Sequence, residues 1–201
     1  MPTLTPPTCT LWKFLALPAR CVTELAGPQT FKVTMEGSAS MSAADRTAQE
    51  EFLRKVARLY RAVYGAQQTA ENVQSRLKTI SDALREAPAV EKQLGAVADG
   101  IEQRNREILR VLRGDVEIAR RSEAVPSSIN DRVTGIMEGE RFSIAKPTQT
   151  HQDAYAIAAE EFSQQLAKLR SLIEVDVAKL EKDMQAAGAP WTPGRVPEWE
   201  K

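Results

Sequence analysis

Apolar side chains recur at alternating spacings of four and three through one long stretch of the chain. The ten positions are Phe52, Val56, Leu59, Val63, Ala66, Ala70, Val73, Leu77, Ile80 and Leu84. On a helix this heptad spacing gives one narrow apolar stripe, which a lone helix cannot bury against itself. The pattern therefore predicts a long helix that packs nearly parallel or antiparallel to partner helices.

The flanking residues set the limits of this helix. Ser42, followed three residues later by Asp45, is a typical N-terminal cap. Pro88 ends the helix, because its ring disfavours helical backbone at Ala87 and removes a hydrogen-bond donor. A helix of roughly 44 residues, at ~1.5 Å per residue, is about 65 Å long. Such a length requires support from other helices along the whole stripe.

Two later stretches repeat the same spacing and supply the partners. The first of these is Val90, Leu94, Val97, Ile101, Arg104, Ile108 and Leu112, which ends near Gly114. The second begins at Thr150, ends at Gly188 and Pro190, and contains Tyr155, Ala158, Phe162, Leu166, Leu169, Ile173, Val177, Leu180 and Met184. The predicted fold is mostly α: a long antiparallel helical hairpin plus a third long helix, forming an elongated three-helix bundle over residues 42–189.

Between the second and third stretches the heptad spacing is lost. There, Ser127 or Ser128 would cap one short helix that ends at Gly139. The apolar positions of that helix are Ile129, Val133, Ile136 and Met137. We interpret residues 115–150 as a connector that carries this helix.

The two ends of the chain are less regular. Residues 1–27 hold prolines and both cysteines without a sustained period, so an irregular segment is expected. Apolar and polar residues then alternate from Thr30 to Glu36, which predicts a single β-strand within a strand-and-linker segment, residues 28–41. A lone strand leaves its backbone groups unpaired, so we expect its sheet in a chain portion absent from this sequence. Residues 190–201 form a Pro/Trp-rich tail, whose Trp191 and Trp199 pack on the bundle or dock on a partner.

Composition narrows the classes of function. Lys plus Arg and Asp plus Glu both number 27, so no net field draws the chain to nucleic acid. No stretch approaches the ~20 apolar residues of a membrane span, and none is predicted. The apolar patch at residues 11–17 lacks a preceding basic region, so a signal peptide is not predicted and the compartment is left open. Cys9 and Cys21 match no metal or redox spacing.

Few residues are candidates for chemistry. His151 is the only histidine, and its place at a helix start indicates a surface or capping role. The carboxylate pairs Glu50/Glu51 and Glu160/Glu161 are adjacent on helices, where neighbouring side chains point about 100° apart. We therefore interpret them as solvated rather than as a glycosidase-like acid pair.

Basic residues gather in two places. The first strip is Arg54, Lys55, Arg58 and Arg61, and the second, denser cluster is Arg104, Arg106, Arg110, Arg113, Arg120 and Arg121. Acidic residues interleave with both, which favours ion-paired surfaces over phosphate recognition. The stretch Gly135–Gly139 lacks the Lys and Ser or Thr of a phosphate loop. No catalytic, cofactor-binding or metal-binding residue is assigned, and no cofactor is predicted.

Two stretches are more specific than generic helix. They are LRVLRGDVEIARRSEAVPSSINDRVTGIMEGERFSI, residues 109–144, and HQDAYAIAAEEFSQQLAKLRSLIEVDVAKLEKDMQAAGAPWTPGRVPEW, residues 151–199. Both resemble the C-terminal helical region of large bacterial sortilin-like (VPS10-type) or BNR-repeat glycosyl hydrolase proteins, and AGAPWTPGRVPEW is the most specific run. FKVTMEG, residues 31–37, resembles the last strand of the immunoglobulin-like β segment that precedes this region in that family.

The resemblance implies a helical tail that belongs with an N-terminal β-propeller. The hydrolase label of the family rests on that propeller, which has no counterpart here, and no S-x-D-x-G-x-T-W motif is present in this sequence. Residues 1–26 depart from the family pattern, as expected of a truncated or frame-shifted gene. The family's propeller proteins are typically exported.

Three functions compete on this basis. The first is a non-catalytic structural or interaction module that packs on a propeller or self-associates through its helical seams. The second is a hydrolase by inheritance, whose activity resides in the absent propeller. The third is an independent helical adaptor or nucleic-acid binder, which the balanced charge disfavours.

Overall fold

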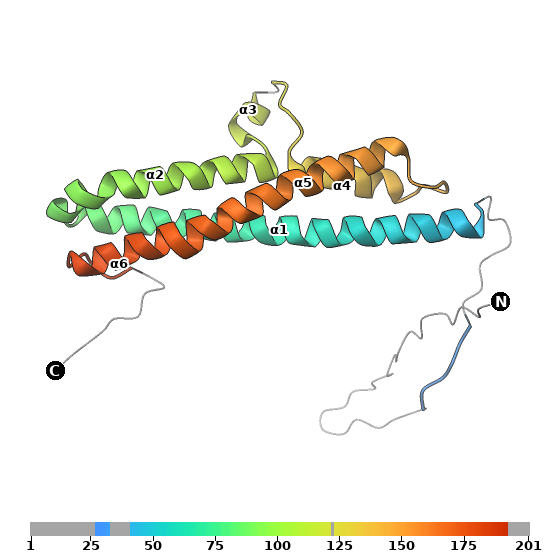
Figure 1. Cartoon of the computed structure of the whole chain (residues 1–201), viewed down its shortest axis with the longest axis horizontal. Helices are drawn as coiled ribbons and strands as arrows, with labels where there is room; N and C mark the ends of the chain where they lie inside the picture. The colour runs from blue at the N-terminus through green and yellow to red at the C-terminus, as the bar shows by residue number, and fades with distance from the viewer. Residues whose placement is uncertain (1–26, 33–40, 122, 193–201) are drawn as a thin grey trace, which may run out of the picture. The chain divides into compact units, whose positions relative to one another are not determined.

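A computed structural model describes residues 27–32, 41–121 and 123–192 of the chain (Figure 1). The chain divides into two units, Met1–Ala39 and Ser40–Lys201. In the first unit, residues 27–32 are exposed and have no regular secondary structure, so the described part of the predicted strand carries none. The rest of that strand, the first 26 residues of the segment 1–27 that was predicted to be irregular, and the tail from residue 193 lie outside the described residues.

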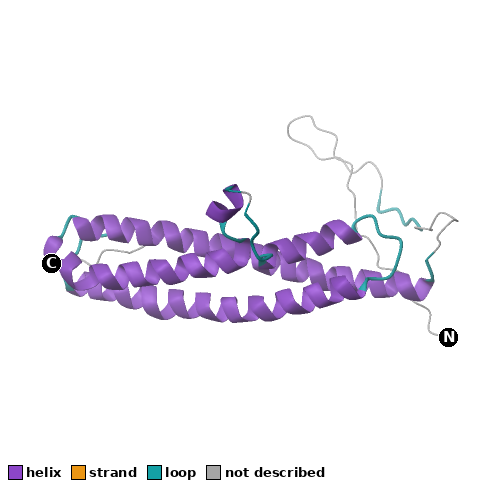
Figure 2. Cartoon of the chain, turned by 90° about the horizontal axis from the view of Figure 1, so that it is seen from above, coloured by secondary structure: helices purple, strands orange, loops and turns teal. Residues whose placement is uncertain are grey.

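The second unit is mostly helical, as predicted, and its described residues contain no strand (Figure 2). The helices in chain order are α1 (Ala43–Arg85), α2 (Pro88–Arg113), α3 (Val116–Arg120), α4 (Ile129–Glu140), α5 (Gln149–Ser171), the π-helical turn η1 (Leu172–Val177) and α6 (Ala178–Ala186). Elements α5, η1 and α6 follow one another without a break.

Both ends of α1 follow from local chemistry. The Ser42 hydroxyl accepts a hydrogen bond from the backbone N–H of Asp45 at 3.1 Å, which confirms the predicted cap. The helix ends at Arg85, and Glu86 and Ala87 connect it to α2. Pro88 occupies the first turn of α2, where its missing N–H costs nothing, so it begins the second helix as well as ending the first.

The predicted apolar stripe of α1 forms the centre of one continuous core. Nine of its ten positions are buried, and the tenth, Phe52, is partly buried against the same core. Elements α2, α4 and α5 contact α1, with α2 beside its C-terminal half and α4 beside its N-terminal half (Figure 1). The stripe is therefore covered along its length by helices of the same chain.

The buried face of α2 differs from the predicted one. Val97 is 50% exposed, whereas Ala98 is 2% exposed, and Asn105 rather than Arg104 is fully buried. The buried positions after Leu94 are Ala98, Ile101, Asn105, Ile108, Leu109 and Leu112. Two consecutive steps of four, from Val90 to Ala98, shift the face by one residue, because 3.6 residues per turn drift from a strict heptad.

Helix α4 belongs to the core, although its segment was predicted as a connector. Its buried apolar side chains are Ile129, Val133 and Ile136. Of the two predicted caps, Ser128 is the one used: its hydroxyl accepts from the N–H of Asp131, whose carboxylate accepts from the N–H of Ser128. This reciprocal capping box fixes where α4 begins.

The third long stretch contains a π-helical turn that its spacing did not predict. Its buried positions are Ala158, Phe162, Gln165, Leu169, Leu172, Val177, Leu180 and Met184. All steps are three or four except the step of five from Leu172 to Val177, which coincides with η1. One extra residue in the turn thus keeps both halves of the stripe on one face. The stretch begins at Gln149, with Thr148 rather than Thr150 before it as the cap.

The described part of the tail continues from α6. Gly188 has a φ of 71°, which suits glycine at a helix end. Ala189 and Thr192 are buried, while Trp191 is 44% exposed. Trp191 is therefore only partly covered by the bundle, and Trp199 lies outside the described residues.

Candidate functional site

A buried carboxylate and the only histidine of the chain form the most unusual polar pair in the described structure. Glu140, the last residue of α4, has a side chain that is 1% exposed, and its Oε1 lies 2.6 Å from Nδ1 of His151 on α5. When the Glu140 carboxylate is ionised it can only accept, and Nδ1 of His151 is then the donor. The pair connects the two ends of the loop between α4 and α5.

Local structure holds the imidazole in place. The Thr148 hydroxyl accepts from the backbone N–H of His151 at 3.2 Å, which fixes the first turn of α5. Gly139 then allows the ring to approach α4, because a Cβ added to this glycine would lie 2.8 Å from Cε1 of His151. Such a distance is a collision, so the pairing of His151 with Glu140 depends on the missing side chain at Gly139.

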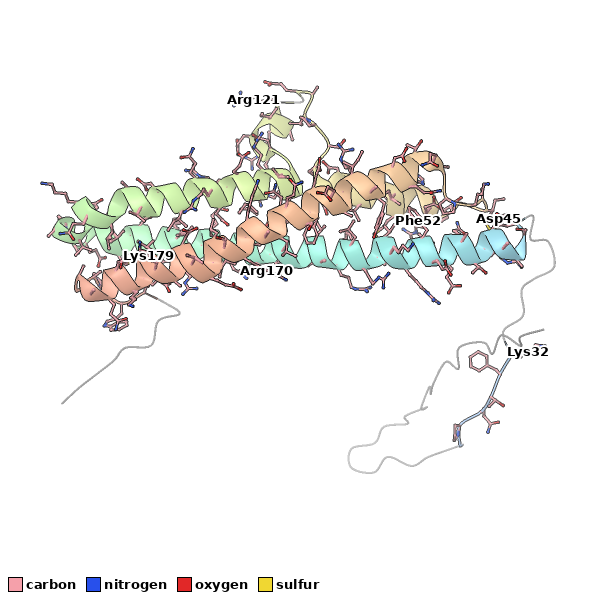
Figure 3. The ribbon with its side chains drawn as sticks, viewed as in Figure 1. Lys32, Asp45, Phe52, Arg121, Arg170 and Lys179 are labelled. Atoms are coloured by element: carbon pink, nitrogen blue, oxygen red, sulfur yellow. The ribbon has the colours of Figure 1, made fainter. Side chains whose placement is uncertain are left out.

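Helix α1 supplies a third contact to this site. Nε2 of Gln49 donates to the backbone carbonyl of Ser143 at 3.1 Å and lies 3.4 Å from Oε2 of Glu140. Further along the same helix lies Phe52, which is labelled in Figure 3. Its ring meets that of Tyr155 of α5 edge-to-face, with centroids 5.9 Å apart. The Gln49–Glu140–His151 cluster therefore joins α1, α4 and α5 at one end of the bundle.

The loop that leaves this cluster, residues 141–147, presents apolar side chains to solvent. Phe142 is 83% exposed and Ile144 is 73% exposed. The Arg141 guanidinium lies over the Phe142 ring, 5.3 Å from its centroid. At the other end Pro147 is buried, and its carbonyl accepts from Nε2 of Gln152 at 3.1 Å. We call residues 141–147 the tip loop.

The chemistry of the cluster is that of an oriented imidazole. With Nδ1 donating to Glu140, a neutral His151 ring has Nε2 as an acceptor, the arrangement that the histidine has in a hydrolase triad. In this structure the His151 ring contacts Glu140 at the end of α4, and the His151 backbone contacts Thr148 at the start of α5. Among the described residues, no group of three or more His, Cys, Asp or Glu side chains is placed to hold a metal ion.

His151 and Glu140 show what the sequence pattern did and did not reveal. The predicted surface or capping role of His151 misses its contact: Thr148 is the cap, and the imidazole binds Glu140. Glu140 was not singled out at all. The signal was present, because Glu140 continues the 4-3-4 spacing of Ile129, Val133 and Ile136 and so falls on the buried face of α4.

The predicted carboxylate pairs lie on helix surfaces. Glu50 pairs with Arg54 at 2.6 Å, one turn along α1, which agrees with the predicted ion pairing of the first basic strip. Glu160 accepts from Nε2 of Gln164 one turn along α5. A shallow depression on α1 is lined by the four residues of the first basic strip together with Glu51 and Ala57. No cluster of facing carboxylates arises from these positions.

The second basic cluster is ion-paired, as predicted. Each of its arginines lies within 4.0 Å of a carboxylate: Arg104–Asp176, Arg106–Glu102, Arg110–Glu107, Arg113–Glu71, Arg120–Glu117 and Arg121–Glu123. The two hydrogen bonds from Arg110 lower the pKa of the Glu107 carboxyl, and the same contact raises the pKa of Arg110. Both side chains are largely exposed, so this pair contributes little to stability.

Neither the helices nor three comparisons with known proteins assign the chain to a class. No helix among residues 41–121 and 123–192 combines the length and the apolar character needed to cross a bilayer. A scan against family models, a search of curated proteins and a search of solved structures found no match to this chain.

Proposed function

We propose that this chain is a non-catalytic helical scaffold and interaction module. In this proposal α1 and α2 form an antiparallel hairpin, and α5, η1 and α6 form a third long arm, giving an elongated three-helix bundle. The observation that carries it is the stripe of α1 from Val56 to Leu84, which helices of the same chain cover along its length. A bundle held together by apolar burial of this extent can present surface residues at defined positions.

Ion pairs between the arms support this reading. Arg76 of α1 binds Glu181 of α6 through two hydrogen bonds of 2.6 Å. Arg104 of α2 binds Asp176 of η1 at 2.8 Å. Arg113 of α2 binds Glu71 of α1 at 2.9 Å. The Arg76–Glu181 pair is bidentate and therefore directional, so it favours one rotation of α6 against α1.

We further propose that the module is the C-terminal helical part of a sortilin-like protein. The support is the resemblance of residues 109–144 and 151–199, and in particular of the run AGAPWTPGRVPEW. Packing on a β-propeller, or self-association through helical seams, follows as the expected partnership. The genomic sequence upstream tests this: a propeller-encoding frame there supports the proposal, and an unrelated frame contradicts it.

An activity assay tests the non-catalytic part of the proposal. The purified chain is incubated with a panel of aryl glycosides, and release of the aryl group is followed over hours. The proposal predicts no turnover above buffer. Reproducible turnover that disappears in Glu140→Gln or His151→Ala, with helicity retained by circular dichroism, would overturn it, because those residues form the one oriented imidazole of the chain.

A further inference from the structure

The tip loop carries the two most exposed large apolar side chains among the described residues. Phe142 is 83% exposed and Ile144 is 73% exposed, and only Ser143 separates them. Single exposed apolar residues are normal on protein surfaces and need no explanation. Two such side chains side by side in one short loop form an apolar tip, which is the kind of feature that marks a contact surface.

The tip is held in place by contacts to the bundle. Nε2 of Gln49 donates to the Ser143 carbonyl at 3.1 Å, between the two apolar residues. The Ser143 hydroxyl accepts from the N–H of Ala145 at 3.3 Å. The Glu140–His151 pair ties together the helix ends on either side. Because the backbone is anchored at these points, Phe142 and Ile144 point outward from a built platform.

The charges of the tip loop all have one sign. Arg141 and Lys146 are exposed on either side of the apolar pair, and neither makes an ion pair with another described residue. Glu140, the carboxylate next to the loop, is turned inward and is 1% exposed. After Glu140, the next acids in sequence on either side of the loop are Glu138 and Asp153, on the flanking helices. The apolar tip is therefore bracketed by free cations.

We propose that the tip loop docks on an anionic lipid surface. Phe142 and Ile144 enter the boundary between headgroups and acyl chains, and Arg141 and Lys146 contact lipid phosphates. This is the arrangement by which interfacial segments combine apolar insertion with attraction to anionic lipid. The inference rests on the proposed scaffold function, since the bundle is what holds the tip outward. The free cations on both sides favour a lipid surface over the apolar pocket of a protein.

Vesicle co-sedimentation of the full chain tests the proposal. Phosphatidylcholine vesicles are compared with and without phosphatidylserine. The double variant Phe142→Ser/Ile144→Ser is expected to lower partitioning at least about tenfold, because both inserting groups are removed. Arg141→Gln/Lys146→Gln is expected to lower it only on the anionic vesicles. The matched control is Val97→Ser/Val175→Ser, which removes two exposed apolar side chains from helix surfaces and leaves partitioning unchanged.

The comparison between variants carries the test, because every variant keeps the apolar residues 11–17 and any lipid affinity that they contribute. Equal partitioning of the parent and the Phe142→Ser/Ile144→Ser variant, with equal thermal midpoints, would overturn the proposal. The hydrolysis assay described above is independent of lipid. A failure of the lipid proposal is therefore distinguishable from a failure of the scaffold proposal.

A fluorescent label gives a second readout. Ile144→Cys is prepared with Cys9→Ser and Cys21→Ser, and the new thiol is labelled with a dye that shifts to the blue in apolar surroundings. The expected result is a blue shift on anionic vesicles and none for the same dye on Val97→Cys. A blue shift that appears without lipid and grows with protein concentration would overturn the proposal in favour of a second copy as the partner.

Discussion

The side-chain amide of Asn105 donates a hydrogen bond to the backbone carbonyl of Ala70 at 2.9 Å, and both residues are fully buried between α2 and α1. The carbonyl oxygen of that amide has no hydrogen-bond partner among the described residues. A half-satisfied buried amide costs stability. In return it specifies the pairing of the two helices, because Nδ2 reaches the Ala70 carbonyl in one register only.

Replacing Asn105 with leucine is expected to stabilise the fold. Asn105→Leu removes the unsatisfied oxygen and fills a similar volume, so the free energy of unfolding should rise by about 1 kcal/mol in urea titrations. Asn105→Ala removes the hydrogen bond and leaves a cavity, so it should lower the same quantity by about 2 kcal/mol. A leucine variant less stable than the alanine variant would contradict this account of the residue.

The Glu140–His151 pair should contribute more to the free energy of unfolding than the surface ion pairs do. His151→Ala leaves a buried carboxylate without its partner and is expected to lower the free energy of unfolding by about 3 kcal/mol. Arg54→Ala breaks an exposed i,i+4 pair and should change it by less than about 0.5 kcal/mol. Similar losses in the two variants, measured in parallel urea titrations, would show that the buried pair is not a structural contact.

Alanine substitutions at two glycines of α4 are expected to change stability in opposite directions. Gly135→Ala should stabilise by about 0.5–1 kcal/mol, since an added Cβ meets nothing within 4 Å and alanine favours helix. Gly139→Ala should destabilise, because its Cβ would collide with the His151 ring. Thermal melts of both variants check this. In a His151→Ala background the collision disappears, and Gly139→Ala should then stabilise; continued destabilisation there would contradict the collision.

Sequence spacing predicted the helices well where apolar periodicity was long and regular. The α1 stripe and the Ser42 cap follow directly from residue pattern, because one narrow face had to be buried. Asn105 was missed because strict heptads select Arg104, whereas 3.6 residues per turn shift the face by one. Glu140 was missed although its spacing places it on the buried face of α4, because the pattern does not reveal its partner, 11 residues away across a loop.

The π-helical turn gives a deletion test. Removing Val175, an exposed residue of η1, turns the step of five between Leu172 and Val177 into a step of four. The stripe then becomes a regular heptad, so the variant should stay folded with a modest change in thermal midpoint. Removing Lys168 instead shortens a regular step of four and rotates Leu169 and Leu172 off the core face, so it should lower the thermal midpoint far more. Equal damage from both deletions would contradict the role assigned to η1.

Helices of the same chain bury the α1 stripe along its length. The most direct measurement compares the thermal midpoints of Leu77→Asp and Lys78→Asp, at adjacent positions of which one is fully buried and the other exposed. The account predicts that Leu77→Asp abolishes cooperative unfolding or costs more than about 4 kcal/mol, while Lys78→Asp changes stability by about 0.5 kcal/mol or less. Equal midpoints for the two variants would contradict the buried stripe and the scaffold built on it.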